Sequence, residues 1–494
     1  MKHAKKLVAM LLLLCLAVPM FAACGKAGDD TTVANTSENQ DSGSQDMSNV
    51  VEVPEVTFDG YEFTFLTGSN VSTCPYIFTD DEEGNAIDEA IHRRNVEIED
   101  KYDITITEIR IQKDSTAGAG AAYTEISKAW ESNDVIYDAA VSSAYDCGTL
   151  AQSGMLADLR DYGYVKLSKV WWDQAANEQL TIYDKIFFTA GDISYIDDNF
   201  TYAITFNKDL ALRLQFEDMY QLVRDGKWTY DKLYTLSKQA TSLDIVDGFS
   251  EGDVYGFLGY NDTTWMSFSS TGSTIAAINN DGELELTLNS EKNFNLIQKW
   301  TEFGKDQSFV NWQMDAAAKT VGWKQIYANN QALFFGATID GIYKLRDTEL
   351  DYGFLPWPKY DEEQEEYRSG MSPNHISLFC IPDIGDDEHI ERNSILVEAI
   401  SAASDIVIEG FYKKNLEGKS VKDNESYETL EIIFANKVFD LGYYYNIGSY
   451  RAGMSVRFRD GLTNFASFYA EQEGAANQKI AEINDLYKKV VEVE

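Results

Sequence analysis

Aromatic residues stand beside carboxylates, amides and hydroxyls at several places in this sequence. Trp265 follows the polar run 261–264, and Tyr145 directly precedes Asp146. A saccharide presents C–H faces and hydroxyl edges, so a site for one needs flat rings next to directional hydrogen-bonding groups. The candidate ligand-binding residues chosen on this basis are Trp265, Tyr145, Asp146, Asn70, Asp192, Trp172, Trp357, Tyr444 and Asn446.

Each candidate also has a purely structural interpretation. Trp172 adjoins another tryptophan, and an aromatic pair at helical spacing usually packs in a core. Trp357 suits either a cleft or the packing of a hinge. The aromatic run 443–445 before Asn446 suits a buried loop whose hydroxyls are satisfied. His375 interrupts an apolar stretch and is expected to be a structural hydrogen-bonding residue.

The sequence carries no recognisable catalytic motif. It contains no G-x-S-x-G, HExxH or P-loop pattern, and the segment 118–120 (GAG) lacks the further glycines of a dinucleotide-binding loop. Carboxylates are so abundant that pairs at glycosidase separations arise by chance. We therefore expect no catalytic residues and no cofactor. A secreted cell-surface glycoside hydrolase is the alternative, and an adhesin is a third possibility.

The net charge and the cysteine content argue against several classes of binding partner. The formal net charge is −40, from 81 acidic and 41 basic residues, which disfavours binding to nucleic acid or anionic headgroups. The cysteines Cys74, Cys147 and Cys380 form no CxxC or Cys/His spacing, so we expect no zinc site. Their disulfide state stays open, because three isolated thiols and one bridge with an odd thiol are both compatible with the sequence.

The amino terminus has the pattern of a secretory signal. Lysines among the first six residues precede the apolar run 7–21, which is short for a membrane span, and small residues then lead to Cys24. This ending resembles a bacterial lipobox, with Phe21 where leucine is usual. The prediction is a signal peptide over 1–23, acylation of Cys24, and a flexible acidic tether over 24–55. An ordinary cleaved signal peptide is the alternative.

Short apolar strands alternate with amphipathic helices in the first globular stretch. A strand from Tyr61 ends in the loop 67–70, and Asn85 suits the cap of a helix. A second strand begins at Ile104, and a buried strand is expected over 138–141. This β-α-β order predicts a parallel sheet, with ligand beyond the carboxyl ends of its strands.

The rest of the chain is long enough to form a second hydrophobic core. Roughly 400 residues of globular composition follow the tether, too many for one core and natural for two lobes. A loop carrying Trp265 is expected after the strand 256–259. The segment 352–358 is punctuated by proline, cannot be helical, and looks like a crossing between lobes. Further elements are expected as strands over 184–190 and 202–206, and as helices from Thr229, over 294–303 and over 476–487.

Five segments in order resemble one family. Residues 151–159 (AQSGMLADL) are similar to a family motif that follows the third strand. The others are 206–209 (FNKD), 228–233 (WTYDKL), 331–336 (QALFFG) and 352–356 (YGFLP). Together they resemble ABC-transporter extracellular solute-binding proteins of the carbohydrate-associated class similar to maltose-binding protein. The chain departs from that pattern at Ser142, where the family has a stacking tryptophan, so maltose in that pose is not expected.

This resemblance implies an α/β, two-lobed periplasmic-binding-protein-like fold of class II, with mostly parallel sheets flanked by helices and joined by a hinge. The expected amino-terminal lobe comprises 56–204 plus about 352–400, and the carboxyl-terminal lobe 205–351 plus about 401–494. The implied function is capture of a carbohydrate, with an oligosaccharide favoured, and delivery to ABC permease transmembrane subunits. The protein is expected to be a monomer at the outer face of the cell membrane, attached only through its lipid anchor.

Overall fold

The computed structural model describes residues 51–69, 77–80, 84–112, 119–243, 249–415, 421 and 423–493. Contacts divide the chain into Met1–Ser44 and Gln45–Glu494, and all that follows concerns the second unit. Cys24, Asn70 and Cys74 lie outside the described residues, so the predictions made for them stay predictions.

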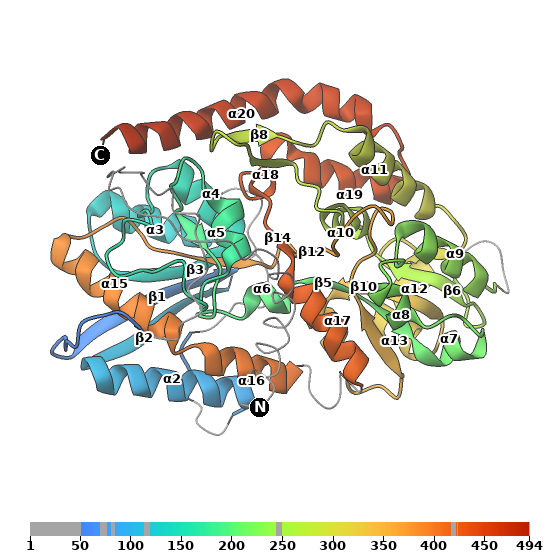
Figure 1. Cartoon of the computed structure of the whole chain (residues 1–494), viewed down its shortest axis with the longest axis horizontal. Helices are drawn as coiled ribbons and strands as arrows, with labels where there is room; N and C mark the ends of the chain where they lie inside the picture. Colours follow the sequence, from blue (N-terminus) through green and yellow to red (C-terminus); the bar gives the residue numbers. More distant parts are fainter. Residues whose placement is uncertain are drawn as a thin grey trace, which may run out of the picture. The chain divides into compact units, whose positions relative to one another are not determined.

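A five-stranded sheet forms the first half of the α/β fold (Figure 1). Its order is β2 (Ile104–Gln112), β1 (Tyr61–Ser69), β3 (Ala139–Ser143), β13 (Ser377–Cys380) and β4 (Phe188–Thr189). β1 runs parallel to β2 and β3, which confirms the predicted β-α-β-α-β unit. β13 is antiparallel to both neighbours, so the sheet is mixed. The expected strand 184–190 contracts to β4, because Tyr183 and Asp184 adopt left-handed backbone conformations.

A second five-stranded sheet has the order β11 (Tyr352–Leu355), β5 (Tyr202–Asn207), β10 (Ala332–Thr338), β6 (Tyr255–Gly259) and β9 (Phe309–Asn311). β10, β6 and β9 are parallel, whereas β5 is antiparallel to β10 and β11. The proline-punctuated segment therefore begins as a strand of this sheet. Its assignment to the amino-terminal lobe, like the other lobe boundaries, stays a prediction.

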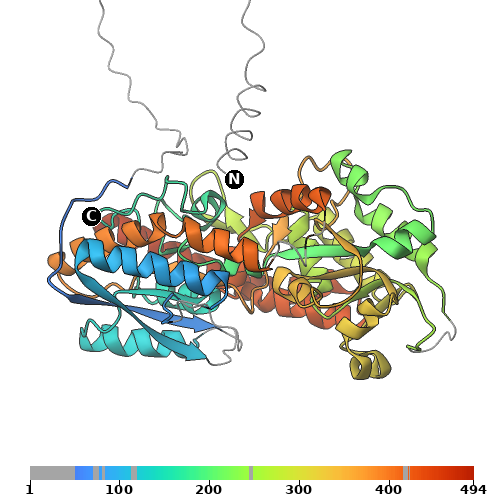
Figure 2. The same cartoon turned by 90° about the horizontal axis from the view of Figure 1, so that it is seen from below.

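Local sequence signals account for the helices around the first sheet. Asn85 caps α2 (Ala86–Tyr102) through a capping box with Asp88. α2 lies beside α16 (Asp405–Asn415), as Figures 1 and 2 show. The other helices packed in this part of the chain are α3 (Ala121–Ser132), α4 (Ala144–Gln152), α5 (Gln174–Leu180), α6 (Ile196–Asn199) and α15 (Asp387–Ala402).

Helices of the second half follow the same rules. Thr229 accepts a hydrogen bond from the Lys232 amide and caps α9 (Tyr230–Ala240), as predicted. The remaining helices are α7 (Lys208–Arg213), α8 (Met219–Arg224), α10 (Thr263–Ser270), α11 (Glu291–Phe303), α12 (Ala316–Val321), α13 (Trp323–Ala328), α14 (Ile339–Tyr343) and α17 (Asn424–Ala435). α10 replaces the expected loop around Trp265.

Two short ribbons and the carboxyl-terminal segment complete the unit. β7 (Ala276–Ile278) pairs with β8 (Leu284–Leu286), and β12 (Ser369–Gly370) pairs with β14 (Lys437–Val438). The final helical elements are α18 (Leu441–Tyr444), the 3₁₀ turn η1 (Ile447–Ser449), α19 (Tyr450–Asp460) and α20 (Phe465–Val493).

The long helix α20 contacts both halves of the fold (Figure 1). Phe465 near its start packs on Phe294 of α11, with ring centroids 5.8 Å apart. Tyr487 near its end packs on Phe187 beside β4, at 4.9 Å. The predicted apolar stripe over 476–487 is buried. α20 therefore packs against elements of both halves.

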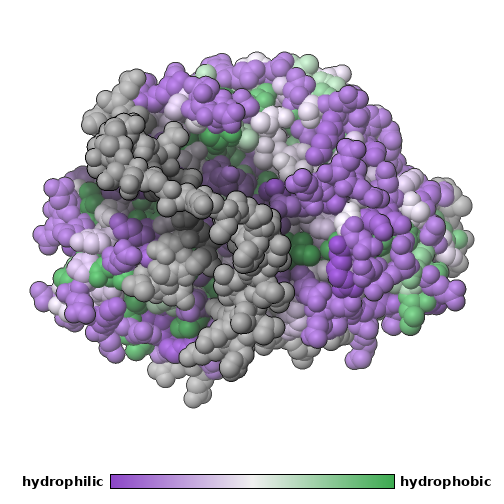
Figure 3. All heavy atoms as spheres, viewed as in Figure 1, coloured by the Kyte–Doolittle hydropathy of each residue, from purple (hydrophilic) through white to green (hydrophobic). Residues whose placement is uncertain are grey.

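Hydrophilic residues dominate the face shown in Figure 3, in keeping with the net charge of −40. Among the residues that the structure describes, none of the helices is both long enough and apolar enough to cross a bilayer.

Candidate functional site

The strand ends of the two sheets position a group of aromatic side chains. β3 ends at Ser143, whose hydroxyl accepts from the Asp146 amide and starts α4, so that Tyr145 falls in the first helical turn. β6 ends at Gly259, and α10 begins four residues later with Trp265 in its first turn. Both residues thus follow the carboxyl end of a parallel strand, where ligands bind in open α/β sheets.

Tyr443 of α18 joins these two residues. Its ring lies 4.8 Å from the Trp265 ring at an interplanar angle of 19°, and 5.2 Å from the Tyr145 ring. The three side chains are 2%, 3% and 4% exposed for Tyr443, Trp265 and Tyr145. Together with Asp262 and Arg451 they form what we call the Tyr443 cluster. The cluster draws on elements that follow both sheets.

A partly buried ion pair borders the rings. Arg451 of α19 donates to Asp262 at 2.9 Å, and Ser455 donates to the other carboxylate oxygen at 2.7 Å. Burial opposes the charge on Arg451, but neighbouring groups, among them the Asp262 carboxylate, raise the pKa of its guanidinium. Burial also raises the pKa of the Tyr145 and Tyr443 hydroxyls. These phenols are therefore neutral at physiological pH and can both donate and accept hydrogen bonds.

Some polar atoms around the cluster have no partner. Within the described residues, the indole nitrogen of Trp265 and the hydroxyls of Ser142 and Thr264 are buried without a hydrogen bond. Buried polar groups are nearly always satisfied, so such atoms point to a ligand or a water. They would suit the hydroxyl groups of a polar solute.

His375 lies in the polar segment before β13. Its ring stacks on Phe200 at 4.7 Å, and its Nδ1 is 2.6 Å from the Ser372 hydroxyl, which confirms the expected structural hydrogen bond. Burial lowers the pKa of His375, against the opposing charges of Asp340 and Asp262. The imidazole is therefore neutral near pH 7.

The side chain of Asp146 stabilises the start of α3. Its carboxylate accepts from the backbone amides of Gly120 at 2.7 Å and Tyr123 at 3.2 Å, which satisfies the amino-terminal end of α3. Burial raises the pKa of Asp146 to about 6, with the amide hydrogen bonds opposing that rise. Although Asp146 follows Tyr145 directly, its oxygens are occupied by the protein backbone.

Trp172 and Asp192 line a separate cavity of about 160 Å³. The Trp172 ring is 2% exposed, and its indole nitrogen donates to Glu398 at 3.1 Å. Lys437 lies at the same cavity and pairs with Asp173 and Asp198 at 2.9 Å each, and with Asp197. Burial, together with the charges of Asp198 and Asp197, raises the pKa of Asp192 to about 8.

Trp357 lies in the core beneath the second sheet. It is fully buried and packs on Trp300 at 5.5 Å and Phe257 at 6.0 Å. A Cβ atom at Gly336 would come within 2.6 Å of the Trp357 ring, so only glycine fits at that point of β10. Trp357 therefore packs in a core, and its role at a hinge stays a prediction.

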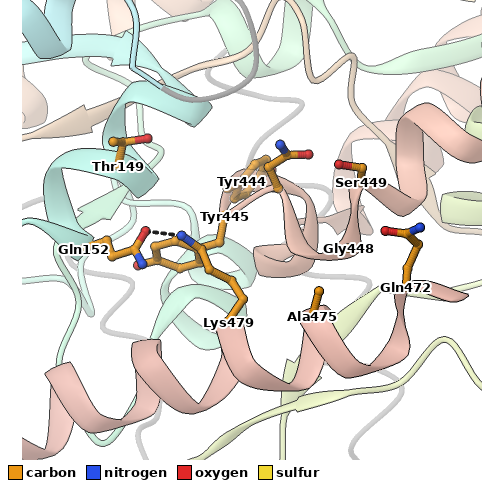
Figure 4. Close-up of a pocket in the computed structure, with 10 residues that line it drawn as sticks. Thr149, Gln152, Tyr444, Tyr445, Gly448, Ser449, Gln472, Ala475 and Lys479 are labelled. Atoms are coloured by element: carbon orange, nitrogen blue, oxygen red, sulfur yellow. Dashed lines mark hydrogen bonds between the residues drawn. The ribbon is translucent and has the colours of Figure 1, made fainter.

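Tyr444 and Asn446 line another cavity, of about 420 Å³, shown in Figure 4. Thr149 and Gln152 of α4 and Lys479 of α20 contribute to its walls. Tyr444 also touches Tyr443, with ring centroids 5.8 Å apart, so α18 faces both this cavity and the Tyr443 cluster.

The structure thus brings Trp265 and Tyr145 to one cluster, Trp172 and Asp192 to one cavity, and Tyr444 and Asn446 to another. Sequence reasoning missed Arg451, which carries no motif and reaches Asp262 only in the folded chain. Tyr443 belonged to an aromatic run that the sequence did single out, but Tyr444 was chosen from it. In the described part of the chain no group of three or more His, Cys, Asp or Glu side chains is placed to hold a metal ion.

Solved structures of carbohydrate-binding proteins are similar to this chain at low identity. An ABC substrate-binding protein of Listeria monocytogenes in complex with cycloalternan is 14% identical and has a TM-score of 0.54, over 86% of this chain and 100% of its own. A cyclic α-maltosyl-1,6-maltose binding protein from Arthrobacter globiformis is 11% identical, with a TM-score of 0.54 over 85% and 99%. This is the fold of two-lobed solute-binding proteins.

A family 1 extracellular solute-binding protein from Bifidobacterium longum subsp. infantis has the same fold, with 13% identity and a TM-score of 0.53 over 87% of this chain and all of its own. No protein-family model matches the sequence, and no curated protein matches it. The solute-binding fold confirms the fold class expected from the five sequence motifs. Within this fold, Tyr145 follows β3 of one sheet and Trp265 follows β6 of the other.

Proposed function

We propose that this protein captures a carbohydrate and delivers it to the transmembrane subunits of an ABC permease. The favoured carbohydrate is an oligosaccharide. The mature chain is a monomer at the outer face of the cell membrane, attached by acyl chains on Cys24. Its lobes are 56–204 plus about 352–400 and 205–351 plus about 401–494. The carbohydrate ligands named for similar structures support this choice of solute.

One observation carries the proposal. Trp265 and Tyr443 form a stacked aromatic platform from α10 and α18, and Tyr145 of α4 covers that platform from the side of the first sheet. A pyranose ring presents an apolar face that packs on such a platform, and neutral phenols bond its hydroxyls.

Binding requires the rings to separate, because they now contact one another. When a hinge motion moves α4 away from α18, a sugar ring enters between Tyr145 and Tyr443. The unpartnered Trp265 nitrogen and Ser142 hydroxyl then bond the solute. Closure on the solute then replaces ring–ring contacts by ring–sugar contacts, so the solute stabilises the arrangement in which both sides of the site contact it.

The carboxylates at this site support binding rather than hydrolysis. Asp262 is held by Arg451 and Ser455, and Asp146 is held by the amides of α3. Glycoside hydrolysis needs one carboxyl group as acid and a second as base or nucleophile at the scissile bond. Neither of these two carboxylates is available for such a role, and the proposal requires no cofactor.

Calorimetry with the mature chain and a panel of neutral mono- and oligosaccharides tests the proposal. We expect saturable binding of at least one oligosaccharide, together with a change in the radius of gyration by X-ray scattering in its presence. Release of reducing ends after long incubation would instead establish the hydrolase. Binding of no member of the panel, or binding without any change in scattering, would remove the support for capture by closure.

A further inference from the structure

The cavity at α4 and α20 has walls from these two helices, from α18 and from the turn that follows α18 (Figure 4). Thr149 and Gln152 come from α4, Lys479 comes from α20, and Asn446 and Ser449 come from the turn that contains η1. Its volume of about 420 Å³ lies within the range of small-molecule sites. Asn446 and Ser449 both have positive φ angles of 50° and 49°, which are uncommon for such residues and set the rim of the cavity.

The chemistry of this cavity differs from that of the rest of the surface. Its lining combines hydroxyls, side-chain amides, two tyrosines and one ammonium group, with no carboxylate, although the chain has 81 acidic and 41 basic residues. In a protein with so many more acidic than basic residues, a cavity lined by one positive charge and no negative charge can select its ligand by charge. It favours an anion that also carries hydroxyl groups.

Lys479 is the group that would hold the negative charge. Its ammonium donates to the Gln152 amide oxygen, and among the described residues no carboxylate lies within ion-pairing distance of it. Glu482, one turn further along α20, instead accepts from Gln478 at 3.0 Å. Burial lowers the pKa of Lys479, against the opposing charge of Glu482. A carboxylate in the cavity would restore a charge-assisted hydrogen bond.

The cavity is distinct from the Tyr443 cluster. Both lie along one face of α4, where Tyr145 meets Tyr443 and Thr149 follows one turn later. Between them, Gly148 lies directly against the backbone of Tyr444, because a Cβ at Gly148 would come within 2.7 Å of the Tyr444 carbonyl. This contact of α4 with α18 separates the two sites.

We propose that this cavity is a second binding site, for a sugar acid such as a uronate, with the carboxylate on Lys479 and the hydroxyls on Gln152, Thr149 and Ser449. The site goes beyond the proposed capture of neutral carbohydrate at the Tyr443 cluster. Because its walls come from α4 on one side and from α18, η1 and α20 on the other, it is complete only while α4 rests against α18, as in the described structure. The same chemistry is offered by a free uronate and by a uronate at the end of an oligosaccharide.

Calorimetry with the mature chain separates these cases. The probes are galacturonate, galactose, and a digalacturonate as the oligosaccharide form. We expect the uronate to bind and galactose to bind at least tenfold more weakly. Binding of digalacturonate but not of the monomer would show that the ligand is a uronate at the end of an oligosaccharide. Equal binding of both would show that a free uronate is sufficient for binding.

The decisive variant is Lys479→Gln, with Lys488→Gln as the matched control. Lys488 lies on the same helix, pairs with Glu283, and does not line the cavity. We expect Lys479→Gln to weaken uronate binding at least tenfold, Lys479→Arg to retain most of it, and Lys488→Gln to leave it unchanged. If Lys479→Gln does not fold, Ser449→Ala at the exposed rim replaces it, with at least a threefold loss expected.

Two outcomes overturn the proposal. One is that the wild-type chain does not bind either uronate, and the other is that Lys479→Gln binds it as the wild type does. Neutral oligosaccharide titrated into the same variants reports separately on the Tyr443 cluster. Failure of one site is therefore distinguishable from failure of the other.

Discussion

The ring of Tyr443 stacks on the indole of Trp265, with centroids 4.8 Å apart and planes inclined by 19°. This contact joins α18 to α10, two elements far apart in the sequence, and Tyr145 completes the group from α4. The polar borders of the group are the ion pair between Arg451 and Asp262 and the unpartnered indole nitrogen of Trp265. It is the part of the described structure in which aromatic rings and polar atoms meet at strand ends of both sheets.

Replacing Tyr443 with leucine tests the platform. We expect affinity for the bound oligosaccharide to fall at least tenfold, about 1.4 kcal/mol, because the central ring is lost. The free energy of unfolding should fall by about 1–3 kcal/mol, since the side chain is buried. Calorimetry and urea denaturation measure the two effects.

The control for that variant is Trp130→Leu on α3, where the side chain is 38% exposed. It removes an aromatic ring of comparable size from the surface, so neither affinity nor stability should change appreciably. Equal loss of affinity in both variants would show that the effect is not specific to the Tyr443 cluster.

Lys437 is the cation that neutralises a group of buried carboxylates. It pairs with Asp173 and Asp198 at 2.9 Å each, and with Asp197. Lys437→Met leaves these carboxylates uncompensated, so we expect a loss of about 3–5 kcal/mol in the free energy of unfolding. Lys128→Met, at an exposed pair with Glu125, should have little effect in the same urea titration.

Asp192 makes stability depend on pH. Its pKa is raised from 3.8 to about 8 by burial and by the charges of Asp198 and Asp197, with Lys437 opposing. Between those two values the folded state binds a proton that the unfolded state releases, so stability falls as pH rises through this window.

The Asp192→Asn variant removes that proton. As the pH rises from about 5 to about 7, we expect the free energy of unfolding of the wild type to fall by about 2 kcal/mol more than that of the variant. Urea denaturation at several pH values measures the difference. Parallel stability curves for the two proteins would show that Asp192 titrates at its ordinary pKa in the folded state.

Cys147 and Cys380 are free thiols in the core, with sulfur atoms 3.9 Å apart. Both side chains are fully buried, and burial raises the pKa of the Cys147 thiol well above its ordinary value. We expect neither residue to be alkylated in the native protein and both to be alkylated after denaturation without reductant. Peptide mapping by mass spectrometry resolves them from Cys74, and a mass two hydrogens lower for the joined peptides would establish a disulfide instead.

Local patterns were sufficient for several elements. The apolar pattern from Tyr61 predicted β1. Asn85 and Thr229 predicted the starts of α2 and α9, because capping depends on neighbours within a few residues. The alternating order of strands and helices predicted parallel pairing of β1 with β2 and β3, because a helix that crosses over between two strands makes them parallel. The α/β character follows from these local signals, whereas the two-lobed fold of class II was implied by the resemblance to solute-binding proteins.

The site required information that is not local. Trp265 was expected in a loop, but α10 begins at Thr263 and the ring is buried by Tyr443. Asp146 was chosen for its place beside Tyr145, yet its carboxylate is held by the amides of α3. Asn70 lies outside the described residues and stays a prediction.

Composition, periodicity and short motifs by themselves determined that this chain forms α/β lobes and contains aromatic and polar residues in suitable loops. Only the tertiary structure decided which of those residues meet. Tyr443, Trp265 and Tyr145 come from three separate elements, and their contact depends on how α18 packs against α4 and α10. Such packing is set by the shape and burial of whole elements, which no window of neighbouring residues contains.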